Sequence, residues 1–302
     1  METTNNRKNG GHASISLKDK KLISIDVGGT LYGHKSINNG YGNINNSDDF
    51  YLGMSSVSMR TIAQLMEKGK YILINSKMED GEMLKKIVAD INYFYGYQLT
   101  GDAEFDSREL KELFESRFYI ASFGGNKISR LEFDGAGFKC ETVTENVFDC
   151  QSVFEDVKNT ECESLSFGVK RVQFKYGDAR EVVDGSRPEC LMRNAHFALV
   201  ELENRGTESY TRFAKAFEQN NRSQLGVSFE DSGELRLEKF CEKSTPILKL
   251  CDVLGLSAKD AIHIGDSSTD KLAGIDSVIV NSRNYDTPNH SKTIEAQLLS
   301  QR

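Results

Sequence analysis

Five polar side chains stand at places in the sequence where a charged ligand could be held. They lie at or close to the ends of predicted strands or at the start of a predicted helix, and they are Asp26, Ser76, Lys243, Asp266 and Asp270. Open α/β sheets gather their ligands at the carboxyl ends of their strands. Each side chain alone has a simpler explanation, such as capping a helix or closing a turn. Their common position nevertheless predicts one site.

The first ordered segment of the chain is KLISIDVGGTLYG, at residues 21–33. Its β-branched run predicts a buried strand, and the glycines after Asp26 predict a turn that suits a phosphate group. The stretch at residues 34–53 is rich in Asn and Gly, with too few apolar side chains to pack tightly. This stretch predicts a long loop or flap.

Strands and helices alternate around these residues. Apolar Met59, Ile62, Leu65 and Met66 recur at helical spacing, and Gly69 suits the C-terminal turn of that helix. The other expected elements are a strand at 71–75, a helix at 81–96, a strand, turn and strand at 118–133, a helix at 244–256, and strands at 261–266 and 277–281. This alternation predicts an α/β fold with a doubly wound parallel sheet.

The middle of the chain has a different pattern. Between residues 143 and 239 the predicted order is helix, two strands, helix and two strands, which indicates a separate α+β domain inserted into the first. We therefore expect a core domain at residues 20–142 and 240–302 and an inserted domain at residues 143–239. Residues 1–19 are expected to form a disordered leader.

The composition limits the classes of partner. The 302 residues carry 38 Lys and Arg against 45 Asp and Glu, a net charge of −7. Such a chain has no basic surface for general attraction to nucleic acid or an anionic membrane, so a phosphate-bearing ligand would need a local cationic site. The six cysteines show no CxxC spacing, and neither a secretory signal nor an apolar run of roughly 20 residues is found. We expect reduced thiols and a cytoplasmic protein.

Taken in order, the motifs resemble those of the haloacid dehalogenase-like (HAD) phosphohydrolases. IDVGGTL resembles their first motif, ILINS the second, and EKSTPILKLCDVLGLSAKDAIHIGDSSTD the third and fourth together. The expected order of elements between the two core segments is similar to the inserted α+β cap of the Cof-type and sugar-phosphate phosphatase branch. SFGGNKI stands where that branch has an Asn-Gly-Gly-like turn.

This resemblance implies a mechanism on a small phosphorylated metabolite. Asp26 would attack the phosphorus and form an aspartyl phosphate, which divides one difficult displacement into two easier ones. Ser76 would donate a hydrogen bond to a phosphoryl oxygen. Lys243 would neutralise the nucleophile and the charge that develops on the phosphoryl group.

The resemblance also implies a Mg²⁺ ion held by hard oxygen ligands. These would be the carboxylates of Asp26 and Asp266 and the backbone carbonyl of Gly28. Asp270 is four positions on from Asp266, so a turn followed by a helical turn can bring both carboxylates to one ion.

Two positions depart from the family's pattern. Gly28 replaces a second Asp that acts as the acid on the leaving oxygen and then as the base on water, a group typically worth about 10²- to 10⁴-fold in rate. Tyr32 or His34 is an alternative source of that proton. Phe123 replaces the Asn usual in the family's turn. We therefore expect an impaired phosphohydrolase.

Two other functions remain open. A catalytically silent binding module with the same fold is consistent with Gly28 and Phe123. IDVGGT also resembles the first phosphate-binding turn of actin-like sugar and pantothenate kinases, in which Asp26 would organise Mg-ATP and the glycines would let backbone N–H groups approach phosphate. The kinase hypothesis leaves GDSSTD and Lys243 unexplained.

Overall fold

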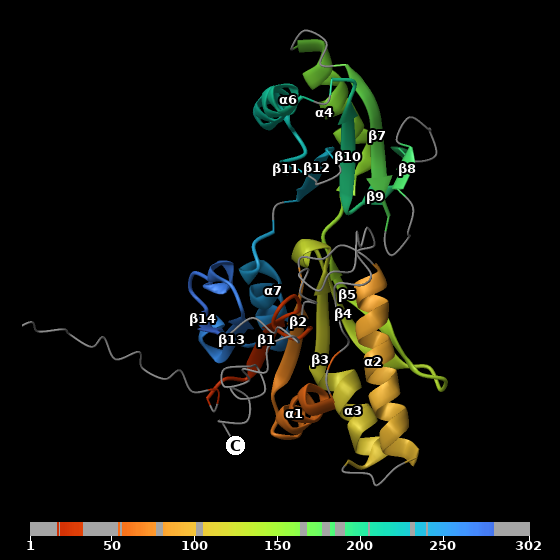
Figure 1. Cartoon of the computed structure of the whole chain (residues 1–302), viewed down its shortest axis with the longest axis vertical. Coiled ribbons are helices and arrows are strands. Elements are labelled where there is room, and N and C mark those ends of the chain that lie inside the picture. The colour runs from red at the N-terminus through yellow and green to blue at the C-terminus, as the bar shows by residue number, and fades with distance from the viewer. Residues whose placement is uncertain are drawn as a thin grey trace, which may run out of the picture.

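The computed structural model describes most of the chain, in segments separated by gaps. The described residues are 17, 19–32, 54, 56–76, 81–100, 105–163, 168–176, 182–184, 191–204, 206–229, 233–239 and 241–280. Two β-sheets of different size, each with its own helices, contain most of these residues (Figure 1).

The larger sheet has seven strands in the order β14-β13-β1-β2-β3-β4-β5. Their bounds are β1 (Leu22–Asp26), β2 (Tyr71–Asn75), β3 (Phe118–Ser122), β4 (Lys127–Phe133), β5 (Phe138–Glu145), β13 (Ala261–Gly265) and β14 (Asp276–Ile279). Neighbours from β14 to β3 pair in parallel, and β4 and β5 extend the sheet with antiparallel pairing. Every residue of β1 is buried, as expected for a strand that is covered on both faces. The predicted α/β fold with a parallel sheet is confirmed.

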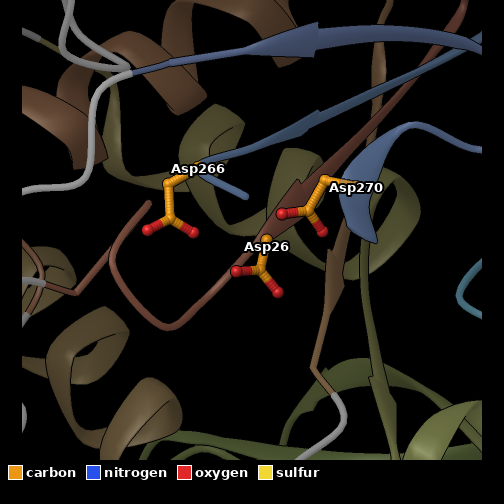
Figure 2. Close-up of side chains that lie close together, drawn as sticks. All are labelled: Asp26, Asp266 and Asp270. Carbon is orange, nitrogen blue, oxygen red and sulfur yellow. The ribbon is translucent and has the colours of Figure 1, made fainter. Parts of the chain in front are cut away.

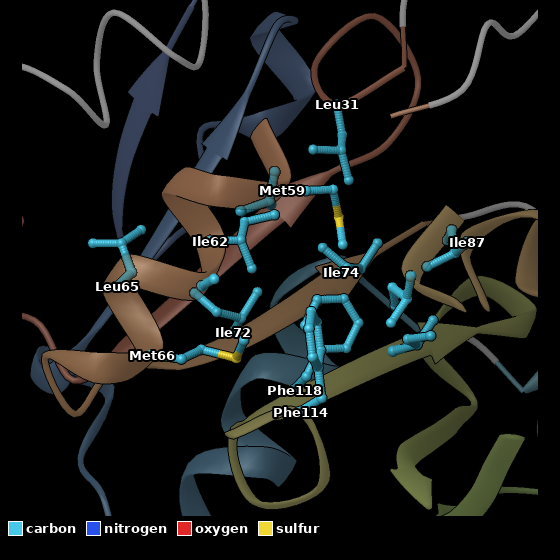
Figure 3. Close-up of a cluster of buried hydrophobic side chains, with 14 of the residues drawn as sticks. Leu31, Met59, Ile62, Leu65, Met66, Ile72, Ile74, Ile87, Phe114 and Phe118 are labelled. Carbon is cyan, nitrogen blue, oxygen red and sulfur yellow. The ribbon is translucent and has the colours of Figure 1, made fainter. Parts of the chain in front are cut away.

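Three helices cover one face of this sheet. They are α1 (Ser56–Glu67), α2 (Gly81–Thr100) and α3 (Ser107–Arg117). Ile72 and Ile74 of β2 pack in one cluster with Met59 and Ile62 of α1 and Phe114 of α3 (Figure 3). The apolar stripe predicted for the first helix is therefore the stripe that meets the sheet.

The opposite face of the sheet packs against α7 (Ser244–Leu254). Leu22 of β1 and Leu73 of β2 lie in a second buried cluster with Ile247 and Leu250 of this helix. Because side chains alternate along a strand, Asp26 leaves β1 on the same face as Leu22. The candidate site therefore forms on the side of α7.

Two elements of the larger sheet unit were not predicted. Helix α3 is mostly polar, with only Leu110 and Phe114 buried, so it gives a weak apolar stripe. Asp106 is the sequence signal for the start of α3, because its side chain accepts from the backbone N–H groups of Arg108 and Glu109. Strand β5 pairs with β4 along its length.

Packing and pairing of the larger unit extend past the expected limits of the core domain. Leu17 is buried in the core cluster, three residues before the expected start at residue 20. The expected boundary at residue 143 falls inside β5, so the chain leaves the larger sheet after Glu145. The loop expected at residues 34–53 and most of the leader at residues 1–19 lie outside the described residues.

The smaller sheet has five strands in the order β11-β12-β10-β7-β8. Its elements are α4 (Cys150–Glu163), β7 (Val169–Lys175), β8 (Val182–Asp184), β10 (Phe197–Leu202), α6 (Thr207–Asn220), β11 (Leu225–Phe229) and β12 (Leu235–Lys239). A further pair joins β6 (Phe148–Asp149) to β9 (Asn194–Ala195). Val153 of α4, Phe213 of α6 and Phe174 of β7 lie in a hydrophobic cluster separate from those of the larger sheet.

Side-chain contacts join the two units beside the turn after β3. Asn126 donates from Nδ2 to the carbonyl of Lys239 (3.1 Å) and accepts at Oδ1 from Asn146 (3.0 Å), so it contacts both connections between the sheets. The ring of Phe123 stacks on His196 of the smaller unit, with centroids 4.1 Å apart. Phe123 has a φ of 51°, which non-glycine residues seldom adopt.

In the described part of the chain, no helix combines the length and the apolar character that crossing a bilayer requires.

Candidate active site

The turn after β1 brings Asp26 to the carboxyl edge of the sheet. Residues 27–32 form a tight loop in which the N–H groups of Leu31 and Tyr32 donate to the carbonyl of Val27 (3.0 and 2.8 Å). Gly29 has a φ of 74°, a conformation that favours glycine. The hydroxyl of Thr30 in this loop donates to Asp266, at 3.4 Å. The glycine turn thus connects the end of β1 to the end of β13.

Three carboxylates converge at this edge of the sheet. Ligand oxygens of Asp26, Asp266 and Asp270 all lie within 4.8 Å of one another (Figure 2). Asp26 comes from the end of β1, Asp266 directly follows β13, and Asp270 ends the 3₁₀ turn η4 (Ser268–Asp270). They meet because β1 and β13 are parallel neighbours, which places their carboxyl ends side by side.

Lys243 brings a positive charge into this cluster. Its Nζ donates to Oδ1 of Asp26 (2.8 Å) and also contacts Oδ1 of Asp270. The residue stands immediately before α7, and Nδ2 of Asn75 at the end of β2 donates to its backbone carbonyl (2.8 Å). The sheet therefore holds the backbone of Lys243 while its side chain reaches two acidic groups.

Asp270 is fixed on every side. Its Oδ1 is contacted by Lys243 and by Nε2 of His263 (3.2 Å), and its Oδ2 accepts from the backbone N–H (3.0 Å) and the hydroxyl (2.7 Å) of Ser267. The side chain packs directly over Gly265, where an added Cβ would overlap the Asp270 carboxyl group. Any larger residue at position 265 would displace this carboxylate.

Burial and the neighbouring charges set the ionisation of these groups. Burial raises the pKa of Asp26 above its ordinary value of 3.8, and Lys243 offsets only part of that rise. Burial would likewise raise the pKa of Asp270, but hydrogen bonds from His263, Lys243 and Ser267 outweigh it and hold the pKa well below the usual range. Burial would lower the pKa of Lys243, but the two aspartates outweigh it and raise that pKa. The ammonium and the Asp270 carboxylate are therefore charged at neutral pH.

Of the five side chains expected from sequence, the structure brings four together: Lys243 contacts Asp26 and Asp270, and Asp266 lies beside these two carboxylates. Ser76 follows Asn75, the residue that pairs in register with Asp26, so it lies at the next strand end. Gly28 lies in the loop after β1, where its backbone bridges to Tyr32.

Tyr32 is not placed to serve as the missing acid. Its side chain is fully buried, and its hydroxyl donates to Asp90 of α2 at 2.6 Å, on the face of the sheet opposite α7. The expectation that Tyr32 could supply the proton is therefore wrong. The other candidate, His34, lies outside the described residues.

Sequence reasoning missed the residues that support the charged groups. His263, Ser24 and Ser267 hold Asp270 directly or through one contact, and Asn75 holds the backbone of Lys243. The available signal was a polar residue within an otherwise apolar run, since Ser24 and His263 interrupt the apolar residues of β1 and β13.

Replacing Lys243 with Met should raise the pKa of Asp26 further. The ammonium favours the charged form of the carboxyl, so its removal leaves the effect of burial without that offset. A ¹³C NMR titration of the Asp26 carboxyl in metal-free protein measures this, with Lys243→Arg as the control that keeps a cation. An unchanged or lower pKa in Lys243→Met would show that Lys243 does not control the ionisation of Asp26.

Comparison with known proteins shows that the fold of this chain is similar to those of several solved structures. No family model and no curated protein matches the sequence. A solved structure from Eubacterium rectale matches with a TM-score of 0.58 and 14% identity, over 93% of this chain and 99% of that one. The IMP-nucleotidase of Plasmodium falciparum matches with a TM-score of 0.52 and 14% identity, over 94% of this chain and 70% of that one. A haloacid dehalogenase-like hydrolase from Bacteroides thetaiotaomicron has a TM-score of 0.47 and 16% identity, over 83% of both chains. The described chain therefore shares its α/β fold with the first two of these structures, both of which match with a TM-score above 0.5.

Proposed function

We propose that the chain is a Mg²⁺-dependent phosphohydrolase that acts on a small phosphorylated metabolite of the sugar-phosphate class. The observation that carries this proposal is the placement of Asp26 against Lys243 and beside Asp266 and Asp270, at the carboxyl edge of the sheet. In-line phosphoryl transfer through an aspartyl phosphate uses a carboxylate as the nucleophile, an ammonium, and acidic groups close enough together to hold a metal ion.

Asp26 is the proposed nucleophile. One oxygen of its carboxylate attacks the phosphorus, the bond to the leaving oxygen breaks, and the phosphoryl group is held as an aspartyl phosphate until water releases it. Lys243 contacts Oδ1 of Asp26 and is charged, so it can neutralise the negative charge that gathers between nucleophile and phosphoryl oxygens. Ser76, at the adjacent strand end, is proposed to donate to a phosphoryl oxygen.

The acidic cluster fits a divalent cation. Three carboxylates face one ammonium, so the cluster as described carries an excess of negative charge that a bound cation would relieve. Its donors are hard oxygens, which Mg²⁺ prefers. Asp26, Asp266 and the carbonyl of Gly28 would hold the ion, with Asp270 direct or through water. When bound, Mg²⁺ supplies positive charge against the phosphoryl oxygens.

The absence of a side chain at Gly28 is expected to slow the proposed reaction. The family's acid/base residue is missing here, and Tyr32, whose hydroxyl is bonded to Asp90, does not replace it. Gly28, unlike Gly29, does not have a positive φ, so its backbone conformation is open to other residues. Relative to the family's pattern, the chain therefore lacks only the acid/base side chain at position 28, and the loop that carries Asp26 is not distorted.

The smaller sheet unit is proposed to act as the cap that covers the site and selects the substrate. Phe123 and Asn126, which contact this unit, lie at the turn after β3, one strand beyond the end of β2. We assign the cap to residues 146–239 and the core to the segments before and after it. A cytoplasmic location is also part of this proposal, and the free thiols of Cys241 and Cys251 are consistent with it.

A binding module that lacks catalysis is the second candidate, and Gly28 is the observation that favours it. The two candidates share the fold and the metal site and differ only in turnover. Mg²⁺-dependent release of phosphate supports the enzyme, whereas consumption of ATP with sugars would support the kinase hypothesis.

Loss of one carboxylate should weaken Mg²⁺ binding. Removing even a partner of a metal ligand typically costs about 10- to 100-fold in affinity, so Asp266→Ala should cost at least that much. Isothermal titration calorimetry measures the affinity. Asp252→Ala, which removes an exposed acid from α7, is the control for a change in net charge. Equal Mg²⁺ affinity in wild type and Asp266→Ala would refute the metal assignment.

The rate defect caused by Gly28 should depend on the leaving group. Acyl phosphates and para-nitrophenyl phosphate leave as weakly basic anions and should turn over measurably, whereas sugar phosphates should be slower by about 10²-fold or more because an alkoxide needs a proton. Steady-state kinetics of Gly28→Asp should show a much larger gain for sugar phosphates than for activated esters, and Asp26→Asn should abolish both. If Gly28→Asp leaves both classes equally inert, the binding module is the better description.

A further inference from the structure

The buried imidazole of His263 has no role in the reaction proposed above, yet it contacts the site. Its side chain is fully buried, with Nε2 at 3.2 Å from Oδ1 of Asp270 and Nδ1 at 3.0 Å from Oγ of Ser24. We infer that His263 is a positioning residue, which orients the Asp270 carboxylate and, through it, the ammonium of Lys243 against Asp26. This inference rests on the proposed phosphoryl-transfer function of the same site.

Strand pairing places the imidazole where it can do this. Ser24 of β1 and His263 of β13 are register partners, so their side chains leave the sheet next to each other. Asp26 lies two residues beyond Ser24 and Gly265 two residues beyond His263, on the same face of the sheet. The missing side chain at Gly265 leaves the space that Asp270 fills.

The ionised state of Asp270 determines which atom donates in each hydrogen bond around it. An ionised carboxylate only accepts, so Nε2 of His263 carries the proton and donates to Oδ1. In a neutral imidazole Nδ1 then accepts from the hydroxyl of Ser24. Among the residues that the structure describes, Oδ1 therefore has two donors, His263 and Lys243, while Oδ2 accepts from Ser267.

Removing the imidazole donor leaves Lys243 as the one described contact of Oδ1. The carboxylate can then rotate about its attachment to Ser267, and the ammonium that follows it moves away from Asp26. Because Lys243 acts on charge that develops during the reaction, the effect should appear in kcat more than in KM.

A purely structural histidine would behave differently. Packing in the sheet requires only the volume of the ring, which Leu approximates, whereas positioning requires a donor directed at Asp270, which Gln retains. His263→Leu and His263→Gln therefore separate the two roles. Ile264→Val is the matched control, since Ile264 is the next residue of β13 and is buried on the opposite face, in the core cluster.

The experiment measures kcat and KM for para-nitrophenyl phosphate, Mg²⁺ affinity by calorimetry and thermal unfolding for the wild type and the three variants. We expect kcat or Mg²⁺ affinity of His263→Leu to fall about 10- to 100-fold with little change in KM. His263→Gln should recover most of that loss. Ile264→Val should lower the unfolding temperature and leave kcat, KM and Mg²⁺ affinity unchanged.

Crystal structures of the two His263 variants give a readout that does not depend on turnover. The contact between Asp270 and Lys243 should be lost or displaced in His263→Leu and kept in His263→Gln. If the wild type shows no turnover, the proposed function fails, and the structures and Mg²⁺ affinities still decide the role of His263. An unchanged Asp270–Lys243 contact in His263→Leu, with kcat and Mg²⁺ affinity within about twofold of wild type, would overturn the inference.

Discussion

The ammonium of Lys243 lies between the carboxylates of Asp26 and Asp270, and the proposed chemistry depends on this contact. Both aspartates are buried, and burying a charge is costly unless it is paired and hydrogen-bonded. Lys243 supplies the pairing, while His263 and Ser267 supply the hydrogen bonds for Asp270. Asp26 receives less support, which is why burial still raises its pKa. An aspartate whose charge is only partly compensated suits the proposed role of a nucleophile beside a metal ion.

The fold produces this contact from three strand ends and one helix start. Parallel pairing of β13, β1 and β2 aligns Asp266, Asp26 and Asn75 along one edge of the sheet. The bond from Asn75 to the carbonyl of Lys243 then ties α7 to that edge. Gly265 leaves room for Asp270 above the strand. Each of these features is local, but the site forms only when the sheet has assembled in the correct order.

The sequence was sufficient to predict the α/β sheet and the side chains that meet at its edge, because β-branched runs, glycine turns and strand ends are local signals. It was not sufficient for the groups that hold those side chains. His263 and Ser24 are 239 positions apart, and their contact follows from the pairing of β1 with β13. No local pattern around either residue predicts the register of that pairing. Tyr32 was misjudged for a related reason: its hydroxyl contacts Asp90, 58 positions away on α2, and only packing reveals that partner. Helix α3 was not predicted because just two of its side chains are buried, which leaves a weak apolar stripe.

The central claim is that Asp26 is a competent nucleophile despite Gly28. The most direct test is to incubate the protein with Mg²⁺ and acetyl phosphate, quench with acid and map phosphorylated peptides by mass spectrometry. The account predicts a phosphoryl group on Asp26 that hydroxylamine removes, and that is absent from Asp26→Asn and from protein treated with EDTA. A wild-type protein with no adduct on Asp26, or with an adduct that persists in Asp26→Asn, would contradict it.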